Sequence, residues 1–318
     1  MLVLAVDLGG SHAGCAIVQD RNLIRSRTIV TSGNDGTATA LASVSAALRH
    51  LAEQEALPLT SFAGIAFGFC GLVDREQGRV TSTSGKYQDA PQLDLPAWAR
   101  KEFGLPLVLE NDARMALLGE RYAGAAEGFD DIVMVTLGTG IGGAAMMGGR
   151  LLTGKHFQAG CLGGHLPLSL DGTPCSCGGI GCAESEAAAW AMPRVCRSWP
   201  GFATSLLARE EITFAALFCC ADAGDAVAQQ VLDRCLRVWG ANAVAMIHAY
   251  DPELLVYGGG VMRSGGDRIV YSVRDHVNRY AWTPWGKVQV RAAALGNTAA
   301  LLGAIPLIAE SRQGVAGV

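Results

Sequence analysis

The chain has 318 residues, of which half are hydrophobic and 17% are charged, and its formal net charge is −4. This length leaves room for two domains, because single hydrophobic cores stop growing near about 250–300 residues. The composition excludes a disordered chain. No run of Lys and Arg offers the basic surface that nucleic-acid phosphates attract, so we expect no nucleic-acid partner.

The N-terminal stretch MLVLAVDLGGSHAG lacks the basic start and the small-residue cleavage site of a signal peptide. No apolar run approaches about eighteen residues, the minimum for a membrane-spanning helix. We therefore expect a cytoplasmic protein without membrane contact. The ten cysteines are too sparse for a disulfide scaffold. Six of them stand among apolar residues and are predicted to be small buried side chains: Cys15, Cys70, Cys196, Cys219, Cys220 and Cys235.

Two glycine-rich turns follow apolar strands in a repeated pattern. Residues 2–6 form the first predicted strand and run into DLGGSHAG, and residues 132–136 form the second and run into LGTGIGG. An offset of 129 residues places Gly9 on Gly138. In both copies another apolar strand follows the glycines, which predicts β-hairpins. The dinucleotide-binding fingerprint and the Walker loop are excluded, because each needs a helix directly after the glycines.

Glycine turns of this kind suit phosphate binding, because their N–H groups can point at an anion where a Cβ would clash. The candidate phosphate-binding residues are Gly9, Gly10 and Ser11 in the first turn and Gly138, Thr139 and Gly140 in the second. Asp7 precedes the first turn and is a candidate ligand for Mg²⁺. The alternative is two ordinary hairpins, but the matched copies favour phosphate. The repeated strand–loop–strand unit resembles the actin-like ATPase architecture.

Between and after the turns, strands alternate with helices. Residues 32–57 predict a surface helix whose apolar face carries Leu41, Val44, Leu48 and Leu51. A buried strand and a turn lie within residues 62–74, and a strand over residues 105–109 precedes a helix from about Ala113. In the second half we predict a helix of some twenty-five residues, a turn at Pro252, a strand over 254–257 and a third glycine loop. A terminal helix is expected to pack back on the first half.

Asp112 stands between the predicted strand 105–109 and the following helix, and it has two interpretations. As an N-cap it would accept a hydrogen bond from an orphan N–H group of the helix. As a residue at the carboxyl end of a strand it would be a catalytic base, because ligands of open α/β sheets gather at that end. The local pattern alone supports both equally.

Three cysteines and a histidine gather in HLPLSLDGTPCSCGGIGC. Cys175, Cys177 and Cys182 follow His165, and the intervening glycines let the chain fold about a centre. One His and three Cys form a closed tetrahedral set suited to structural Zn²⁺, with no position left for catalysis. A disulfide would leave one thiol unpaired and needs an oxidising compartment. Free thiols or a redox loop remain the alternatives.

Taken together, these motifs resemble the ROK family of sugar kinases and sugar-responsive repressors. The resemblance covers essentially the whole chain and rests on VDLGGSH, ENDARMALLGE, LGTGIGG, CSCGGIGCAE and LLVYGGGV. It implies an α/β, two-lobed actin-like ATPase (ribonuclease H-like) fold with central mixed sheets and the sugar in the cleft. The smaller lobe would comprise residues 1–115 and 299–318, and the larger one residues 116–298. The implied activity is ATP-dependent phosphorylation of a hexose or a hexose derivative.

The resemblance also implies roles for particular residues. Asp112 would be the general base, and Asn111, His165 and Glu184 would bind the sugar, with His165 also binding zinc. Gly258, Gly259 and Gly260 would form a loop on the adenosine side. ATP, Mg²⁺ and structural Zn²⁺ are the implied cofactors, and the implied assembly is a homodimer.

The chain departs from the family pattern at three places. Leu162, or Cys161 if the loop is shifted, replaces a glutamate that binds sugar, so the choice of sugar is in doubt. The stretch SGKYQDAP offers Lys86, Tyr87 or Asp89 to the substrate, although an exposed polar loop is the favoured interpretation. His12 stands where a lysine is frequent, and we predict a hydrogen-bonded structural role for it.

Two other functions remain as hypotheses. A sugar-responsive regulator is disfavoured, because family regulators carry a helix-turn-helix segment ahead of the first phosphate turn, which here starts at residue 7. A sugar-binding protein without catalysis is disfavoured by Asp7, Asp112, Thr139 and the three glycine loops, but the departure at Leu162 keeps it open.

Overall fold

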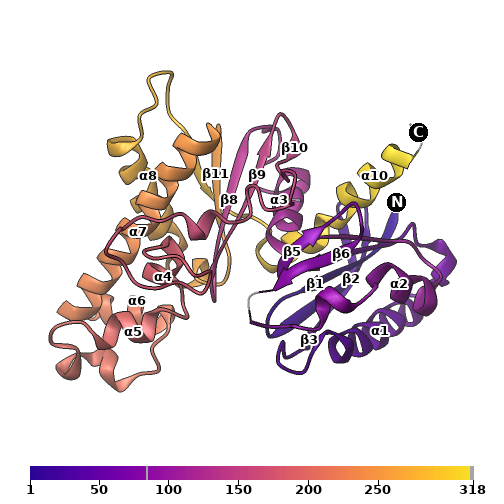
Figure 1. Ribbon diagram of the computed structural model, residues 1–318, viewed down its shortest axis with the longest axis horizontal. Helices are drawn as coiled ribbons and strands as arrows, with labels where there is room; N and C mark the ends of the chain where they lie inside the picture. Colours follow the sequence, from indigo (N-terminus) through magenta and orange to yellow (C-terminus); the bar gives the residue numbers. More distant parts are fainter. Residues whose placement is uncertain (84, 316–318) are drawn as a thin grey trace. The chain divides into compact units, whose positions relative to one another are not determined.

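The computed structural model describes residues 1–83 and 85–315 as two compact units (Figure 1). Unit 1 comprises Met1–Gly128, Thr153–Ala159 and the residues from Ala294 on, and unit 2 comprises Phe129–Leu152 and Gly160–Ala293. The sequence-based boundary at residue 115 would divide helix α3 (Asp112–Ala123), which lies wholly in unit 1. Ser84 and residues 316–318, the end of the expected terminal segment, lie outside the described residues.

Unit 1 is built on a five-stranded mixed sheet with the strand order β3-β2-β1-β4-β7. Its strands are β1 (Leu2–Leu8), β2 (His12–Gln19), β3 (Asn22–Val30), β4 (Ile65–Phe69) and β7 (Leu107–Asn111). Strand β1 pairs antiparallel with β2 and parallel with β4, which pairs parallel with β7. A separate hairpin joins β5 (Gly71–Asp74) to β6 (Arg79–Thr83). The parallel strands place the carboxyl ends of β1, β4 and β7 at one edge.

The helices of unit 1 are α1 (Thr37–Gln54), α2 (Leu95–Phe103), α3, α9 (Ala299–Leu302) and α10 (Ala304–Val315). Helix α1 buries the predicted apolar face of Leu41, Val44, Leu48 and Leu51 in the core of unit 1. It begins at Thr37 and not at residue 32. The reason is that Asp89 of a distant loop accepts a hydrogen bond from the Thr37 N–H at 2.7 Å and so caps the helix.

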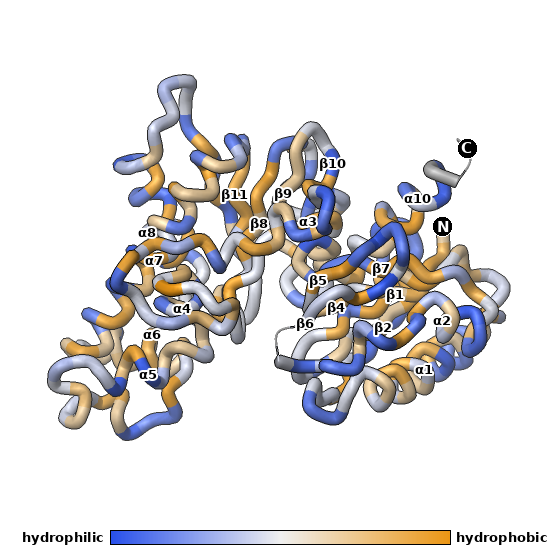
Figure 2. The backbone as a smooth tube through the Cα atoms, in the orientation of Figure 1, coloured by the Kyte–Doolittle hydropathy of each residue, from blue (hydrophilic) through white to orange (hydrophobic). Residues whose placement is uncertain are grey.

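Unit 2 repeats the arrangement of unit 1, as the duplicated turns predict. Its five-stranded sheet has the order β10-β9-β8-β11-β12. The strands are β8 (Ile132–Leu137), β9 (Ile141–Met147), β10 (Arg150–Leu151), β11 (Leu254–Gly258) and β12 (Gln289–Ala292). Strand β8 pairs antiparallel with β9 and parallel with β11, so it occupies the place that β1 has in unit 1. Figure 2 shows apolar residues concentrated along these central strands.

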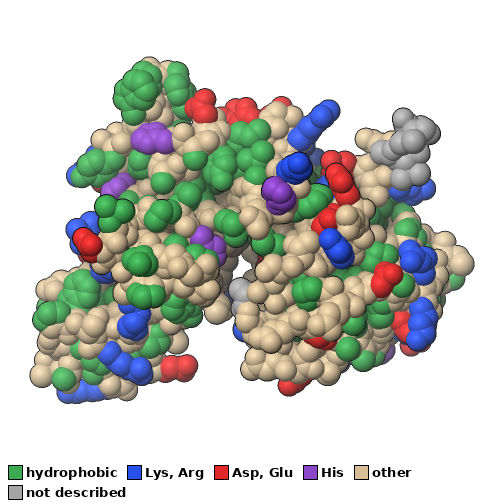
Figure 3. All heavy atoms as spheres, in the orientation of Figure 1, with side chains coloured by type: hydrophobic (Ala, Val, Ile, Leu, Met, Phe, Trp, Pro, Cys, Tyr) green, Lys and Arg blue, Asp and Glu red, His purple; other side chains and the backbone are tan. Residues whose placement is uncertain are grey.

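The helices of unit 2 are α4 (Ala183–Ala187), α5 (Met192–Arg197), α6 (Phe214–Asp222), α7 (Ala226–Tyr250) and α8 (Met262–Tyr280). Helix α7 has the predicted length of 25 residues. The loop between α8 and β12 carries exposed aromatic side chains, with Trp282 80% exposed, and Figure 3 shows hydrophobic side chains at the surface there. No described helix is both long and apolar enough to cross a membrane.

Four of the six cysteines predicted to be buried are buried, namely Cys15, Cys196, Cys220 and Cys235. Cys70 is partly exposed, and the prediction is wrong for Cys219, which is exposed. Cys219 and Cys220 are neighbours on α6, and successive helical residues point about 100° apart, so only one of them can face the core.

The terminal helices pack on α3 within unit 1, as predicted for the end of the chain. Gly119 of α3 and Gly303 between α9 and α10 permit this close approach. A Cβ on Gly119 would overlap the Ala299 carbonyl, and one on Gly303 would overlap the Met115 carbonyl. Because α3 is held in this way, its first residue, Asp112, has a fixed place at the end of β7.

Candidate functional site

The first glycine turn joins β1 to β2 in the predicted hairpin. Strand β1 extends past the predicted end at Val6, because Asp7 pairs with Gly14 of β2 and Gly68 of β4. Asp7 is therefore presented by a sheet strand and not by the turn. The Gly9 N–H donates to the His12 carbonyl at 3.0 Å and closes the turn.

The tip of the first turn is suited to an anion. Among the described residues, the N–H groups of Gly10 and Ser11 have no hydrogen-bond partner. The Ser11 hydroxyl lies 3.0 Å from the exposed His12 Nδ1, in keeping with the hydrogen-bonded role predicted for that histidine. Free backbone donors beside a hydroxyl are the groups that phosphate oxygens bind.

The second glycine turn joins β8 to β9 in unit 2 and has the same construction. The Gly138 N–H donates to the Gly140 carbonyl at 3.0 Å, and Leu137 pairs with Ile141 across the hairpin. The Thr139 carbonyl accepts a hydrogen bond from the Trp190 N–H at 3.1 Å. Within the described chain, the N–H groups of Thr139 and Gly140 have no partner, so this turn also offers free donors.

Asp112 is not the N-cap of α3. Strand β7 extends to Asn111, and the Asn111 side chain caps the helix by accepting a hydrogen bond from the Arg114 N–H at 3.2 Å. Asp112 is the first helical residue, and its Oδ1 accepts from the Ala113 N–H at 2.8 Å and from Asn111 Nδ2 at 2.9 Å. Asn111 Nδ2 also donates to the Gly71 carbonyl at 3.1 Å. The capping interpretation is therefore wrong for Asp112, and Asn111 holds the Asp112 carboxylate in place.

Asp7 and Asp112 form a carboxylate pair at the edge of the unit 1 sheet. Burial, together with the smaller effect of the nearby Asp112 charge, raises the pKa of Asp7 to about 7. Burial also raises the pKa of Asp112 to about 6, against the opposing hydrogen bonds from Ala113 and Asn111. Two carboxylates that disfavour each other's charge are a natural place for a cation or a proton.

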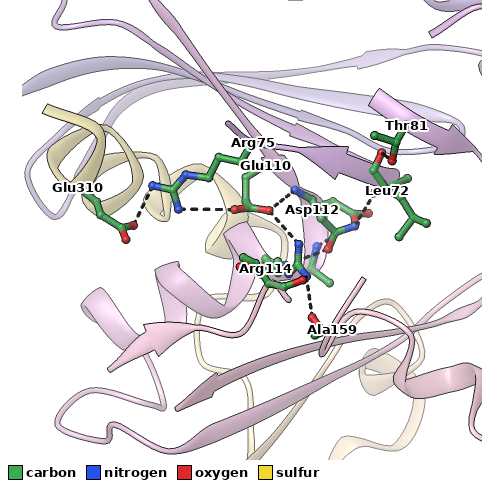
Figure 4. Close-up of polar contacts among 12 residues, drawn as sticks. Leu72, Arg75, Thr81, Glu110, Asp112, Arg114, Ala159 and Glu310 are labelled. Carbon is green, nitrogen blue, oxygen red and sulfur yellow. Dashed lines mark hydrogen bonds and ion pairs between the residues drawn. The ribbon is translucent and has the colours of Figure 1, made fainter. Parts of the chain in front are cut away.

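Beneath this pair lies a buried ionic network that the sequence analysis missed. Glu110 and Arg114 are fully buried, and Arg114 Nη1 lies 3.5 Å from Glu110 Oε1. Arg75 lies 3.7 Å from Glu110 Oε2 and 2.9 Å from Glu310 of α10. Arg114 Nη2 donates to the Ala159 carbonyl at 2.6 Å. Figure 4 shows these contacts around Asp112, and they tie β7, α3 and α10 together beneath it.

In unit 2, His165 of the short helical turn Gly163–His165 and Cys175, Cys177 and Cys182 come together as predicted. Their ligand atoms all lie within 4.8 Å of one another. Cys177 Sγ lies 3.7 Å from Cys182 Sγ, and Cys175 Sγ lies 3.5 Å from His165 Nδ1. Tetrahedral Zn²⁺ would separate two sulfurs by about 3.8 Å and a sulfur from a nitrogen by about 3.5 Å. The donor set therefore fits zinc in both chemistry and spacing.

Glu184 joins the cysteine loop to the second glycine turn. It lies in α4 directly after the cluster, and its Oε2 accepts from the Ile141 N–H at 2.8 Å. Its Oε1 accepts from Trp190 Nε1 at 3.2 Å. A Cβ on Gly140 would lie 2.5 Å from Glu184 Oε2, so a larger residue at position 140 would displace this carboxylate from its present place.

The third glycine loop follows β11, as predicted. Gly259 has a φ of +91°, and a Cβ there would overlap the backbone of Leu137 at the end of β8. The Val261 N–H donates to the Leu137 carbonyl at 3.0 Å. Gly258, Gly259 and Gly260 therefore bring the chain against the strand that leads into the second turn.

The stretch of Lys86, Tyr87 and Asp89 is not simply an exposed polar loop. Tyr87 is fully buried, and its hydroxyl donates to the Gly9 carbonyl at 3.0 Å. Lys86 Nζ donates to the Gly10 carbonyl at 3.2 Å. Asp89 caps α1, so Asp89 and Tyr87 both have structural roles.

In unit 2, Leu162 is 38% exposed and presents an apolar side chain where the resemblance implies a glutamate.

Comparison with known proteins places this geometry in a family. The family model described as the ROK family matches residues 3–311. The chain is 32% identical to the glucokinase of Thermotoga maritima over 97% of each protein.

Solved structures agree with the family match. The ROK hexokinase from Thermus thermophilus has a TM-score of 0.82 and 28% identity, covering 99% of this chain and 100% of that one. A ROK family glucokinase from Streptomyces griseus, in complex with glucose and AMPPNP, has a TM-score of 0.81 and 28% identity, covering 98% of this chain and 100% of that one. These neighbours confirm the predicted actin-like ATPase fold. This chain belongs to the ROK family.

Proposed function

We propose that this chain is an ATP-dependent kinase that phosphorylates a hydroxyl group of a hexose or a hexose derivative, with Asp112 as the general base. The observation that carries the proposal is the pairing of Asp7 with Asp112 beside a glycine turn with free N–H donors. Relatives named glucokinase and a neighbour bound to glucose and AMPPNP support the same activity.

The transfer needs little covalent help from the protein. The sugar hydroxyl oxygen forms a bond to the γ-phosphorus of ATP, while the bond from that phosphorus to the bridging oxygen breaks and ADP leaves. The hydroxyl proton goes to the Asp112 carboxylate, whose place is fixed by the hydrogen bonds from Asn111 and Ala113. Positioning of the reactants and electrostatic stabilisation then supply most of the rate enhancement, because the protein only has to align the reactants and neutralise the phosphate charge.

The residues present fit ATP and Mg²⁺. The turn donors at Gly10, Ser11, Thr139 and Gly140 suit phosphate oxygens, and the close approach at Gly259 suits a loop beside the nucleotide. Asp7 offers a hard carboxylate oxygen that Mg²⁺ prefers, directly or through water. When bound, the ion would neutralise phosphate charge, and it would also relieve the repulsion between Asp7 and Asp112.

We propose that Zn²⁺ at His165, Cys175, Cys177 and Cys182 has a structural role. The four protein ligands leave no position for water or substrate. His165 uses Nδ1 toward the cluster, so its Nε2 is available to a sugar hydroxyl. Glu184 follows the last cysteine and is proposed as a second sugar contact, and Asn111 as a third in unit 1. The apolar Leu162 should change which sugar hydroxyls are recognised.

We also propose a cytoplasmic location and a homodimer, of which the homodimer rests on the family resemblance. The alternative function is a sugar-binding or regulatory protein of the same family without catalysis. It predicts sugar binding with no release of ADP.

The test is a coupled assay of ADP release over a panel of hexoses, N-acetylhexosamines and rarer sugars. We expect at least one sugar to give ADP with the natural chain, and Asp112→Asn to lower kcat by at least about 10²-fold, as loss of a general base does. Asp267→Asn, an exposed residue of α8, is the matched control and should keep full activity. If no sugar gives ADP above the Asp112→Asn background, the kinase proposal fails.

A further inference from the structure

Lys86 lies along the first glycine turn, in a groove that two glycines leave open. A Cβ on Gly10 would lie 2.5 Å from Lys86 Nζ and 2.9 Å from its Cδ, and one on Gly33 would lie 2.5 Å from Lys86 Cβ. The lysine stem therefore occupies the space that side chains at positions 10 and 33 would fill. At the end of the stem, Nζ donates to the Gly10 carbonyl at 3.2 Å.

The backbone around Lys86 is held to the same turn. The Tyr87 N–H donates to the Gly33 carbonyl at 2.8 Å, and the Gly33 N–H donates to the Gly10 carbonyl at 3.4 Å. The buried Tyr87 hydroxyl donates to the Gly9 carbonyl at 3.0 Å. Tyr87, the residue that follows Lys86, is thus held by both its N–H and its hydroxyl, and the Lys86 ammonium group is itself bonded to the turn.

The ammonium group has donors to spare. It carries three N–H groups, and the Gly10 carbonyl takes one of them. Among the described residues Lys86 makes no ion pair with a carboxylate. The charges of Lys86, Asp7 and Asp112 all act on the pKa of the Cys70 thiol, so the ammonium and the two carboxylates lie in the neighbourhood of that thiol in unit 1.

We propose that Lys86 binds the γ-phosphoryl group of ATP at the first glycine turn and neutralises its charge during transfer. The inference rests on the proposed kinase function and adds a catalytic residue to it. The free N–H groups of Gly10 and Ser11 and the Lys86 ammonium then form one anion site, which combines backbone donors with a full positive charge. Lysine serves phosphate as such a point charge.

The test compares Lys86→Met with the natural chain, because methionine keeps most of the stem in the glycine groove and removes the charge. We expect kcat to fall roughly 10²-fold, which is typical for loss of one preorganised group at a developing charge. The KM for sugar should stay within about twofold, since the sugar contacts are untouched. Lys101→Met, at an exposed position of α2, is the matched control and should behave as the natural chain does.

A binding measurement separates this role from packing. Calorimetry with ATP and with ADP should show that Lys86→Met weakens the binding of ATP more than the binding of ADP, because only ATP carries the γ-phosphoryl group. Unchanged kcat and ATP affinity in Lys86→Met would overturn the inference. Equal losses of affinity for ATP and for ADP, together with a lowered melting temperature, would also overturn it, because they would assign Lys86 to packing alone. If the natural chain phosphorylates no sugar, the kinase proposal fails, while the ATP and ADP comparison still tests Lys86.

Discussion

Asp7 and Asp112 carry the proposed chemistry, and their environment determines how they behave. Sequence reasoning selected both residues but could not decide whether Asp112 caps a helix. The ambiguity arose because the strand was predicted to end at Leu109, whereas it continues to Asn111. That shift moves the cap to Asn111 and makes Asp112 the first helical residue, with its carboxylate positioned by its neighbours.

The raised pKa of Asp112 predicts how activity depends on pH. A base must be deprotonated to accept the hydroxyl proton, and burial raises the pKa of Asp112 to about 6. We expect kcat/KM to rise with pH up to about 6–7 and then level off, with roughly a tenfold loss for each pH unit below the bend. A profile measured at saturating Mg²⁺ checks this. A flat profile between about pH 5 and 8 would contradict the assignment.

The raised pKa of Asp7 predicts a change in stability. The pKa of Asp7 is about 7 in the folded chain, and its ordinary value is 3.8. The contribution of this carboxyl group to the free energy of unfolding is therefore fully present below pH 3.8 and is lost as the pH rises through about 7. Asp7→Asn removes the charge. Without Mg²⁺ we expect this variant to be more stable than the natural chain by about 1–2 kcal/mol at pH 8, and nearly equal at low pH. Melting curves that show the variant less stable at pH 8 would contradict this.

The three neighbours Lys86, Tyr87 and Asp89 show where sequence reasoning ends at the residue scale. Each has a different partner: Gly10 for Lys86, Gly9 for Tyr87, and the start of α1 for Asp89. These partners lie 52 to 78 residues away in the sequence. Local composition indicates a polar loop, and only the tertiary fold gives each side chain its role.

At the scale of elements, the glycine hairpins were predictable because their signal is local. Apolar strands on both sides of a glycine turn specify a hairpin without help from the rest of the chain. The Glu110–Arg114 pair was not predictable, because a Glu and an Arg four residues apart usually lie on an exposed helix face. Here Glu110 lies in strand β7 and Arg114 in the first turn of α3, and both side chains are fully buried. Each charge therefore needs the other as its partner.

In the cysteine loop, the sequence spacing of the histidine and the three cysteines was enough to predict a zinc site. We expect purified protein to contain about one zinc per chain, as one closed four-ligand site predicts. Cys177→Ser should lose the metal and raise the KM for sugar, because the loop that positions His165 and Glu184 is folded by the ion. Cys219→Ser changes an exposed cysteine outside the cluster and should keep both metal and activity. Folded natural protein with well under one zinc per chain would count against the site.

At the scale of the whole molecule, two units with the same strand order repeat one design. The duplicated turns in the sequence indicated this repeat, and the two sheets confirm it. The return of the terminal helices to unit 1 was also predictable, because their apolar pattern needs a partner. The extent of unit 1 was harder to predict, since residues 153–159 belong to it although they follow the second hairpin.

The most direct test of the kinase proposal is to identify the product. The natural chain, Asp112→Asn and the control Asp267→Asn are each incubated with ATP, Mg²⁺ and the sugar panel, and the sugar phosphate is measured by mass spectrometry. The account predicts a sugar monophosphate and an equal amount of ADP from the natural chain and the control, and almost none from Asp112→Asn. ADP without any sugar phosphate, or equal product from all three chains, would contradict it.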